Sequence, residues 1–317
     1  MVHPLQLLQP LQPLNPLHPF KTERMIIVRY KGGMGNQMFQ YAFGRQLARQ
    51  LNADLVFDPT NLLYRNNPPD FVYRNYDLDV FRPRYTRFLA PPALLAPVYN
   101  LRLKKLSQAV SWAVKRGGAV RKEPHFHFSS EVLDEAREGI IYDGWWQSPK
   151  YFAGVEEEVR EDFRFSHAII PQSKDLLARI EGSNAVCLNV RRTDFLKVDT
   201  LNATNKEYFL RGADHLGGQL SEPRFFVFSD DVAWCRENIK LAYPTEFVGH
   251  EHKGFKFGNY MQLMTRCRHF LIPNSSFAWW ATWLNTGADK LVVAPENWFT
   301  DPTIDTSDLV PESWSRM

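Results

Sequence analysis

The second half of the chain alternates apolar strands with helices, and this pattern constrains the fold more than any other feature of the sequence. Its apolar segments are 184–190, 224–229, 245–250, 269–273 and 290–295. The stretches between them have helical spacing around 206–216, 231–239, 258–267 and 276–284. Strands that are apolar throughout and joined by helices form parallel sheets covered on both faces. The pattern predicts a parallel α/β domain.

The first half begins with a second α/β unit. From Met25 the order is a strand, a glycine-rich turn, a helix and a strand, at 25–30, 31–36, 37–52 and 53–58. Spacings of three and four put Phe39, Phe43 and Leu47 on one helix face, with Arg45 and Arg49 outside. A strand at 139–147 and a helix ending near Phe163 follow, and the segment 166–173 connects the two units. Together, the 317 residues predict two Rossmann-like domains facing each other across a cleft.

Two segments stand apart from this α/β pattern. Residues 1–24 repeat proline, leucine and glutamine, and we expect a disordered extension there. Residues 82–122 carry ten Lys or Arg and no Asp or Glu. We favour a solvated helical insertion for this basic block, and the alternative is peripheral contact with an anionic membrane surface.

Composition excludes several classes of protein. A net charge of +3 gives little drive to bind nucleic acid. No apolar run approaches the roughly 20 residues that span a bilayer. Three widely spaced cysteines, Cys187, Cys235 and Cys267, lack metal-type spacing and are expected to be reduced and buried. We therefore expect a cytoplasmic protein, with the inner membrane face as a peripheral location.

Polar residues follow several predicted strands directly, where parallel α/β domains bind their ligands. These positions are Gly32 to Asn36, Arg191 to Asp194, Asp230 with Asp231, and Asn274 to Ser276. Two adjacent arginines leaving a buried strand need an anionic partner, and their planar forks suit phosphate oxygens. The alternative is an ion pair between Arg191 or Arg192 and Asp194.

A second anion site is expected where a strand turns into the helix at 276–284. Free N–H groups and the helix dipole there favour a phosphate beside Asn274, Ser275 and Ser276. Simple capping of the helix by Ser275 is the alternative, and it does not exclude phosphate binding. With the arginines, this helix start would form a two-sided phosphate cradle.

Two further motifs, a glycine cluster and a D-x-D triplet, resemble known ligand-binding patterns. The glycines at 32, 33 and 35 do not fit the dinucleotide fingerprint, because Met38 stands where a glycine is needed. Gly33 and Gly35 are interpreted instead as allowing close backbone approach to a ligand, with a simple tight turn as the alternative. Asp77 and Asp79 match a metal-binding D-x-D, but such a triplet arises readily by chance. We favour a structural role for this pair.

Taken together, the motifs resemble the inverting α-1,2-fucosyltransferase family of bacterial surface-polysaccharide clusters and animal blood-group synthesis. They cover nearly the whole chain from Met25 and occur in the family's order: GGMGNQMFQYAFG, YDGWWQSPKYF, NVRRTDF, FFVFSDD, NSSFAWWATWL and APENWF. The resemblance implies a GT-B type fold, inversion at the sugar carbon, and no metal or other cofactor. Residues 25–168 would form the acceptor-side domain and residues 169–317 the GDP-fucose-binding domain.

The resemblance also assigns roles to residues. Arg191 and Arg192 would bind the donor phosphates. The acceptor would be a galactose-containing glycan, either free or linked to a lipid. The remaining donor-side positions are Gly33, Gly35, Asn36, Asn189, Ser229, Asp230, Asp231, Asn274, Ser275, Ser276 and Phe277. Asp194 is the expected general base, or else it orients the arginines.

This chain departs from the family pattern at two positions. Asn189 stands where the family has His, and asparagine cannot titrate, so Asn189 is not a base. Thr193 stands where glycine is frequent and resembles the related α-1,6-fucosyltransferases. Two alternatives therefore stay open, a fucosyltransferase of α-1,6-like linkage and a non-catalytic protein that binds a sugar nucleotide.

Overall fold

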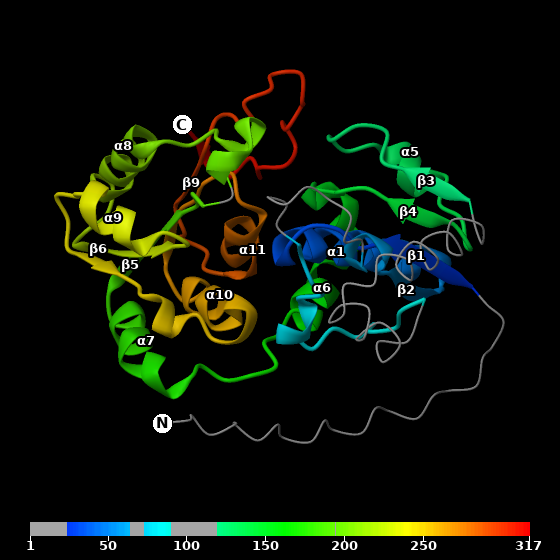
Figure 1. Cartoon of the computed structure of the whole chain (residues 1–317), viewed down its shortest axis with the longest axis horizontal. Helices are drawn as coiled ribbons and strands as arrows, with labels where there is room; N and C mark the ends of the chain where they lie inside the picture. Colours follow the sequence, from blue (N-terminus) through cyan, green and yellow to red (C-terminus); the bar gives the residue numbers. More distant parts are fainter. Residues whose placement is uncertain (1–23, 64–72, 90–118, 194) are drawn as a thin grey trace.

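The computed structural model describes residues 24–63, 73–89, 119–193 and 195–317. It contains two parallel β-sheets, each accompanied by helices (Figure 1). This arrangement confirms the α/β class and the GT-B type expected from the sequence. The expected disorder of residues 1–24 and most of the expected basic insertion lie outside the described residues, so both stay predictions.

The first sheet has four parallel strands in the order β2-β1-β4-β3. They are β1 (Met25–Arg29), β2 (Asp54–Asp58), β3 (Val120–Lys122) and β4 (Ile141–Asp143). The accompanying helices are α1 (Met34–Leu51), α2 (Thr60–Leu63), α5 (Ser130–Asp134) and α6 (Glu156–Asp162). β1 is an interior strand, and its residues Ile26 to Val28 are buried, as its unbroken apolar sequence predicts.

The second sheet has six parallel strands in the order β10-β9-β8-β5-β6-β7. They are β5 (Asn184–Val190), β6 (Pro223–Ser229), β7 (Thr245–Phe247), β8 (His269–Leu271), β9 (Val292–Ala294) and β10 (Ser315–Arg316). Its helices are α7 (Lys174–Glu181), α8 (Lys206–Gly217), α9 (Val232–Asn238), α10 (Gly258–Met264) and α11 (Ser276–Leu284). Cys187, Cys235 and Cys267 are buried free thiols, as expected.

Helix α1 corrects one expectation. Arg49 is exposed as predicted, but Arg45 is buried, and its Nε lies 3.3 Å from Oδ2 of Asp162. The Tyr41 hydroxyl donates to the same carboxylate oxygen at 3.0 Å. Helical spacing predicts that Arg45 faces solvent. Because α6 covers this part of α1, Arg45 lies in the interior instead. The buried guanidinium is tolerated because a buried carboxylate pairs with it.

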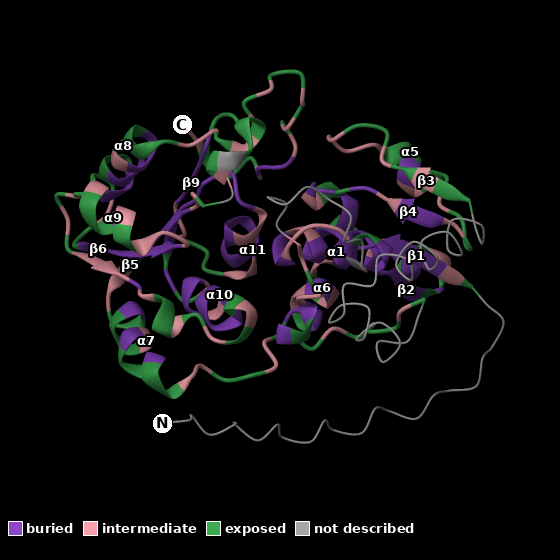
Figure 2. Ribbon diagram, in the orientation of Figure 1, coloured by how far each residue is buried: buried purple, intermediate pink, exposed green. Residues whose placement is uncertain are grey.

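A shared aromatic core joins the two sheets. Phe39 of α1 packs against Trp279 and Trp280 of α11, with ring centroids 4.6 and 4.9 Å apart. Phe152, which also belongs to the first half of the chain, stacks on Trp280. Figure 2 shows α1 and α11 side by side and largely buried. The two units are therefore held together by helix packing, and the domain boundary at residue 168 stays a prediction.

Gly35 lies where the backbones of these two helices approach each other closely. A Cβ built on Gly35 would lie 2.4 Å from the carbonyl carbon of Ser276 and 2.5 Å from the nitrogen of Phe277. Both are backbone atoms, so they cannot move aside as a flexible side chain would. The glycine therefore allows the first turns of α1 and α11 to meet.

We expect Gly35→Ala to destabilise the protein by about 3 kcal/mol or more, because the added methyl group forces two packed helices apart. Thermal unfolding followed by circular dichroism measures the loss. Gly33→Ala is the matched control, since a Cβ there would meet nothing closer than 3.9 Å. Equal unfolding midpoints for the two variants would contradict this account.

Candidate functional site

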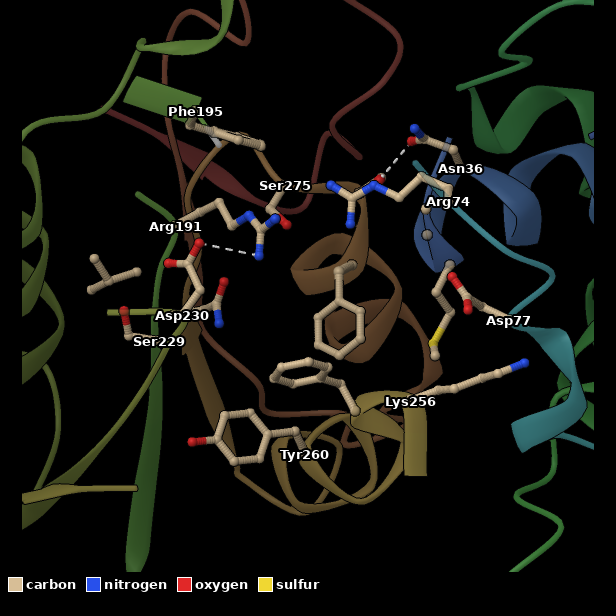
Figure 3. Close-up of a pocket in the computed structure, with 18 residues that line it drawn as sticks. Asn36, Arg74, Asp77, Arg191, Phe195, Ser229, Asp230, Lys256, Tyr260 and Ser275 are labelled. Atoms are coloured by element: carbon tan, nitrogen blue, oxygen red, sulfur yellow. Dashed lines mark hydrogen bonds and ion pairs between the residues drawn. The ribbon is translucent and has the colours of Figure 1, made fainter. Parts of the chain in front are cut away.

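A cavity of about 220 Å³ lies where the start of α1 meets the carboxyl edge of the second sheet (Figure 3). Both halves of the chain contribute to its walls. The first half supplies Gly33, Met34, Gly35, Asn36, Arg74 and Asp77. The second half supplies Asn189, Val190, Arg191, Phe195, Ser229, Asp230, Lys256, Phe257, Tyr260, Ser275, Ser276 and Phe277.

Two helix N-termini open into this cavity. Helix α1 begins after Gly33 and α11 begins after Ser275, and neither of these two residues caps its helix with a side-chain hydrogen bond. The N–H groups of a first helical turn have no partner within the helix, and the helix dipole makes this end positive. The alternative that Ser275 simply caps α11 is therefore not what the structure shows, and the two helix ends together favour an anionic ligand.

Asn36 ties the two helix starts together. Its Oδ1 accepts a hydrogen bond from the Ser276 hydroxyl at 2.7 Å and another from the Gln147 amide at 2.8 Å. Gln147 follows β4, so a single side chain joins α1, α11 and the edge of the first sheet. Its polar end is thereby fixed at the cavity wall.

Arg191 carries the positive side chain that the sequence places at this edge. It leaves the end of β5 and extends into the cavity, where Nη1 lies 3.2 Å from Oδ2 of Asp230 (Figure 3). Asp230 also accepts the backbone N–H groups of Arg192 and Thr193, at 3.0 and 3.1 Å. The carboxylate thus fixes the turn after β5 and orients Arg191. A guanidinium has five donors in a planar fork, a geometry that suits phosphate oxygens.

Arg192 points away from Arg191. Its guanidinium lies over the Trp234 ring, 3.7 Å from the centroid, and its Nε is 3.5 Å from Oδ2 of Asp231. Asp231 in turn accepts the N–H of Trp234 and begins α9. The structure therefore brings only one of the two predicted arginines to the cavity, and a direct phosphate contact from Arg192 stays a prediction.

Some of the other predicted positions line the cavity and others do not. Asn189, Ser229 and Phe277 line the cavity, whereas Asn274 is buried behind it. The Asn274 amide donates to the carbonyl oxygens of Leu201 and Trp298, at 2.8 and 2.9 Å, which fixes the loop before α11. Asp194, the expected base, lies outside the described residues.

Several cavity residues were missed from the sequence because they come from irregular segments. Arg74 lies against Gly33 at the start of α1. Lys256 and Phe257 lie in a loop that contains one 3₁₀ turn, at Phe255–Phe257, and their own φ angles are +48° and +61°. This left-handed conformation costs a non-glycine residue about 1 kcal/mol or more. This loop places the Phe257 ring at the cavity beside Tyr260. A sequence carries no periodic signal for such a loop.

The D-x-D pair is split by the structure. Lys256 Nζ lies 2.8 and 2.7 Å from the two carboxylate oxygens of Asp79, and this ion pair links the two halves of the chain. Asp77 instead lines the cavity, where burial raises the pKa of its carboxyl group to about 6 despite the opposing effect of Lys256. Within the described residues no cluster of three metal-ligating side chains occurs.

We expect Asn36→Asp to weaken the binding of inorganic pyrophosphate at least tenfold. The aspartate can still accept both hydrogen bonds and is favourable at a helix N-terminus, so the fold should persist, but its charge opposes an anion in the cavity. Calorimetric titration measures the affinity. Asn205→Asp adds the same charge at the exposed start of α8, away from the cavity, and should leave the affinity unchanged. Equal affinities for all three proteins would exclude an anion site at Asn36.

Known proteins resemble this chain over most of its length. An alpha-1,2-colitosyltransferase of Escherichia coli is 27% identical, and the alignment covers 92% of this chain and 99% of that protein. The O-antigen biosynthesis glycosyltransferase WbnK of Escherichia coli is 25% identical, with coverage of 90% and 98%. The galactoside 2-alpha-L-fucosyltransferase Sec1 of Mus musculus is 24% identical, with coverage of 88% and 68%.

Among solved structures, the NodZ alpha-1,6-fucosyltransferase co-crystallized with GDP aligns at a TM-score of 0.47 and 15% identity, covering 82% of this chain and 92% of that one. That likeness is too distant to bear on ligand or activity. In the described residues, no helix is both long and apolar enough to span a membrane. The model of glycosyl transferase family 11 matches residues 87–316. Because this match covers more than half of the chain, the protein belongs to glycosyltransferase family 11, as its motifs indicated.

Proposed function

We propose that this protein transfers L-fucose from GDP-fucose to the 2-hydroxyl of a galactoside, with inversion at the sugar carbon and without a metal. One observation carries the proposal: Arg191 and the uncapped starts of α1 and α11 meet at a single cavity. A diphosphate is the part of a sugar nucleotide that such a site would bind. Its family relatives with α-1,2 linkage support the reaction class.

In this proposal the site acts on the leaving group. As the bond between the sugar carbon and the phosphate oxygen breaks, negative charge grows on the departing GDP. Fixed donors that are already oriented stabilise such charge without reorganising, and each is worth about 3 kcal/mol in comparable sites. Arg191, held by Asp230, and the N–H groups at the start of α11 supply these donors.

The metal-dependent alternative needs both carboxylates of the D-x-D pair on one cation. Asp79 is engaged by Lys256 through both of its oxygens, and only Asp77 faces the cavity. This split favours a site that stabilises the diphosphate with its own cationic groups.

The relatives suggest two related donor sugars. By their names, the Escherichia coli relative transfers colitose and the Mus musculus relative transfers fucose. Colitose is fucose without its 3-hydroxyl, so a site that hydrogen-bonds this hydroxyl would discriminate strongly between the two donors. We propose fucose as the donor and colitose as the second candidate. The acceptor would be a galactose-containing glycan of a surface polysaccharide, carried on a lipid and reached from the cytoplasmic membrane face.

We expect Arg191→Ala to lower the transfer rate by at least a hundredfold and the affinity for GDP by at least tenfold, because a desolvated anion loses its charged partner. Transfer is measured by release of GDP, and binding by calorimetry. Arg211→Ala, which removes an exposed charge from α8, is the control and should behave like the unaltered protein. Full activity of the Arg191 variant would refute the phosphate role.

A donor and acceptor panel tests the reaction itself. We expect GDP-fucose to outcompete GDP-colitose on galactosides, the product to be α-1,2-linked by NMR, and the rate to persist in excess chelator. An α-1,6 product would favour the alternative linkage, and GDP-fucose binding without any turnover would favour a non-catalytic protein. Loss of activity in chelator would return Asp77 and Asp79 to a metal site.

A further inference from the structure

We propose that Asp77 is the general base that removes the proton from the acceptor hydroxyl. The inference rests on the proposed function and adds a catalytic residue to it. Figure 3 shows Asp77 on the side of the cavity formed by the first half of the chain, facing Arg191 and Asp230 on the other side. No described carboxylate other than Asp77 and Asp230 lines this cavity.

The placement fits an inverting displacement. In such a reaction the acceptor oxygen attacks the sugar carbon from the face opposite the departing diphosphate. Among the groups proposed to hold the diphosphate, Arg191 and the start of α11 belong to the second half of the chain, and the start of α1 lies against α11. A base is then expected on the wall away from Arg191, and Asp77 is the carboxylate of that wall.

Asp230 is unsuited to the same role. Its two oxygens accept hydrogen bonds from the N–H groups of Arg192 and Thr193, and it pairs with Arg191 as well. Both oxygens of this carboxylate are already engaged by partners in the second half of the chain, so neither is placed to receive a proton from an acceptor hydroxyl. It also lies beside the proposed leaving-group site.

Asp77 is held in place while its carboxyl group stays available. Its backbone N–H donates to Gln37 Oε1 at 2.9 Å, and the Gln37 amide donates to the carbonyl oxygens of Gly32 and Asn75 at 3.0 and 2.7 Å. These bonds fix the segment to the start of α1. Within the described part of the chain, no hydrogen bond or ion pair engages the Asp77 carboxyl group, in contrast to Asp79.

The surrounding charges suit a base that works near neutral pH. Burial raises the pKa of Asp77 to about 6, Lys256 and Arg74 oppose the rise, and Asp79 adds to it. The Tyr76 hydroxyl, whose own pKa burial raises, stays neutral. At pH 7 Asp77 is therefore ionised, yet a better proton acceptor than an exposed aspartate.

The proton and electron count closes within the proposed reaction. The acceptor O–H proton moves to an Asp77 carboxylate oxygen while the acceptor oxygen forms its bond to the sugar carbon. The bond from that carbon to the phosphate oxygen breaks, and its electron pair leaves with GDP. Asp77 returns the proton to solvent once the product departs.

The test is Asp77→Asn, which preserves shape and removes the base. We expect kcat to fall at least a hundredfold while GDP affinity is kept or rises, because the variant lacks proton transfer, keeps the diphosphate site and loses a negative charge from the cavity. In the unaltered protein kcat should fall as the pH drops through about 6, when Asp77 becomes protonated. Asp79→Asn, two residues away, is the matched control and should retain an acid limb, moved to lower pH because the Asp79 charge contributes to the raised pKa of Asp77.

Thermal unfolding shows whether the Asn variant is folded. A carboxyl group whose pKa is raised in the folded state favours folding at low pH, and that contribution is lost as the pH rises through about 6. Asp77→Asn should therefore unfold at a higher temperature than the unaltered protein at pH 8, and the difference should shrink towards pH 4. This readout does not depend on activity.

The outcomes separate the two proposals. If the unaltered protein transfers fucose while Asp77→Asn keeps both its rate and the acid limb, the inference about Asp77 is wrong and the proposed function stands. If the unaltered protein binds GDP-fucose but never transfers it to any galactoside, both are overturned. Loss of rate and of the acid limb in a stable, GDP-binding Asp77→Asn protein supports the base.

Discussion

The close approach of α1 and α11 at Gly35 is the contact on which the site depends. Each helix follows a central strand of a different sheet, so the contact fixes one α/β unit against the other. It also brings two positive helix ends to the same cavity without an intervening side chain. The aromatic packing of Phe39 against Trp279 and Trp280 supports this contact from behind. Relative movement of the two units would therefore disturb the site before it disturbed either sheet.

Charge at the cavity is balanced in a way that leaves room for an anionic ligand. Arg191, Lys256 and the helix ends are positive, whereas Asp230 and Asp79 are each bound to a cationic neighbour. Asp77 is partly buried, and in the described part of the chain its carboxyl group has no such bond; its raised pKa reflects the cost of keeping it ionised there. The left-handed backbone at Lys256 and Phe257 is a second local cost at the same cavity. Unfavourable local features of this kind accumulate at functional sites, where the surrounding fold maintains them.

Much of the fold could be predicted from local pattern. The apolar runs of β1, β5 and β6 specify buried parallel strands, because both of their faces are covered. The strands β10 and β3 could not be identified, because their sequences, SR and VRK, are mostly polar and carry no apolar run. Arg45 was predicted to be exposed, and this was wrong. Helical spacing shows which way a side chain points, but it does not show that another element, here α6 with Asp162, covers that side.

Within the site, the sequence alone determined which residues leave the strand ends: Arg191, Asp230, Ser275 and the glycines before α1. Strand ends are predictable because alternation of strands and helices sets them locally. Only the tertiary structure decided that Arg192 turns to Trp234, that Asp79 pairs with Lys256, and that Asp77 faces Arg191 across the cavity. The physical reason is that these outcomes depend on contacts between residues up to about 180 positions apart. The two contacts that join the halves of the chain, at Asp79 and at Asp77, exist only after α1 and α11 have packed together.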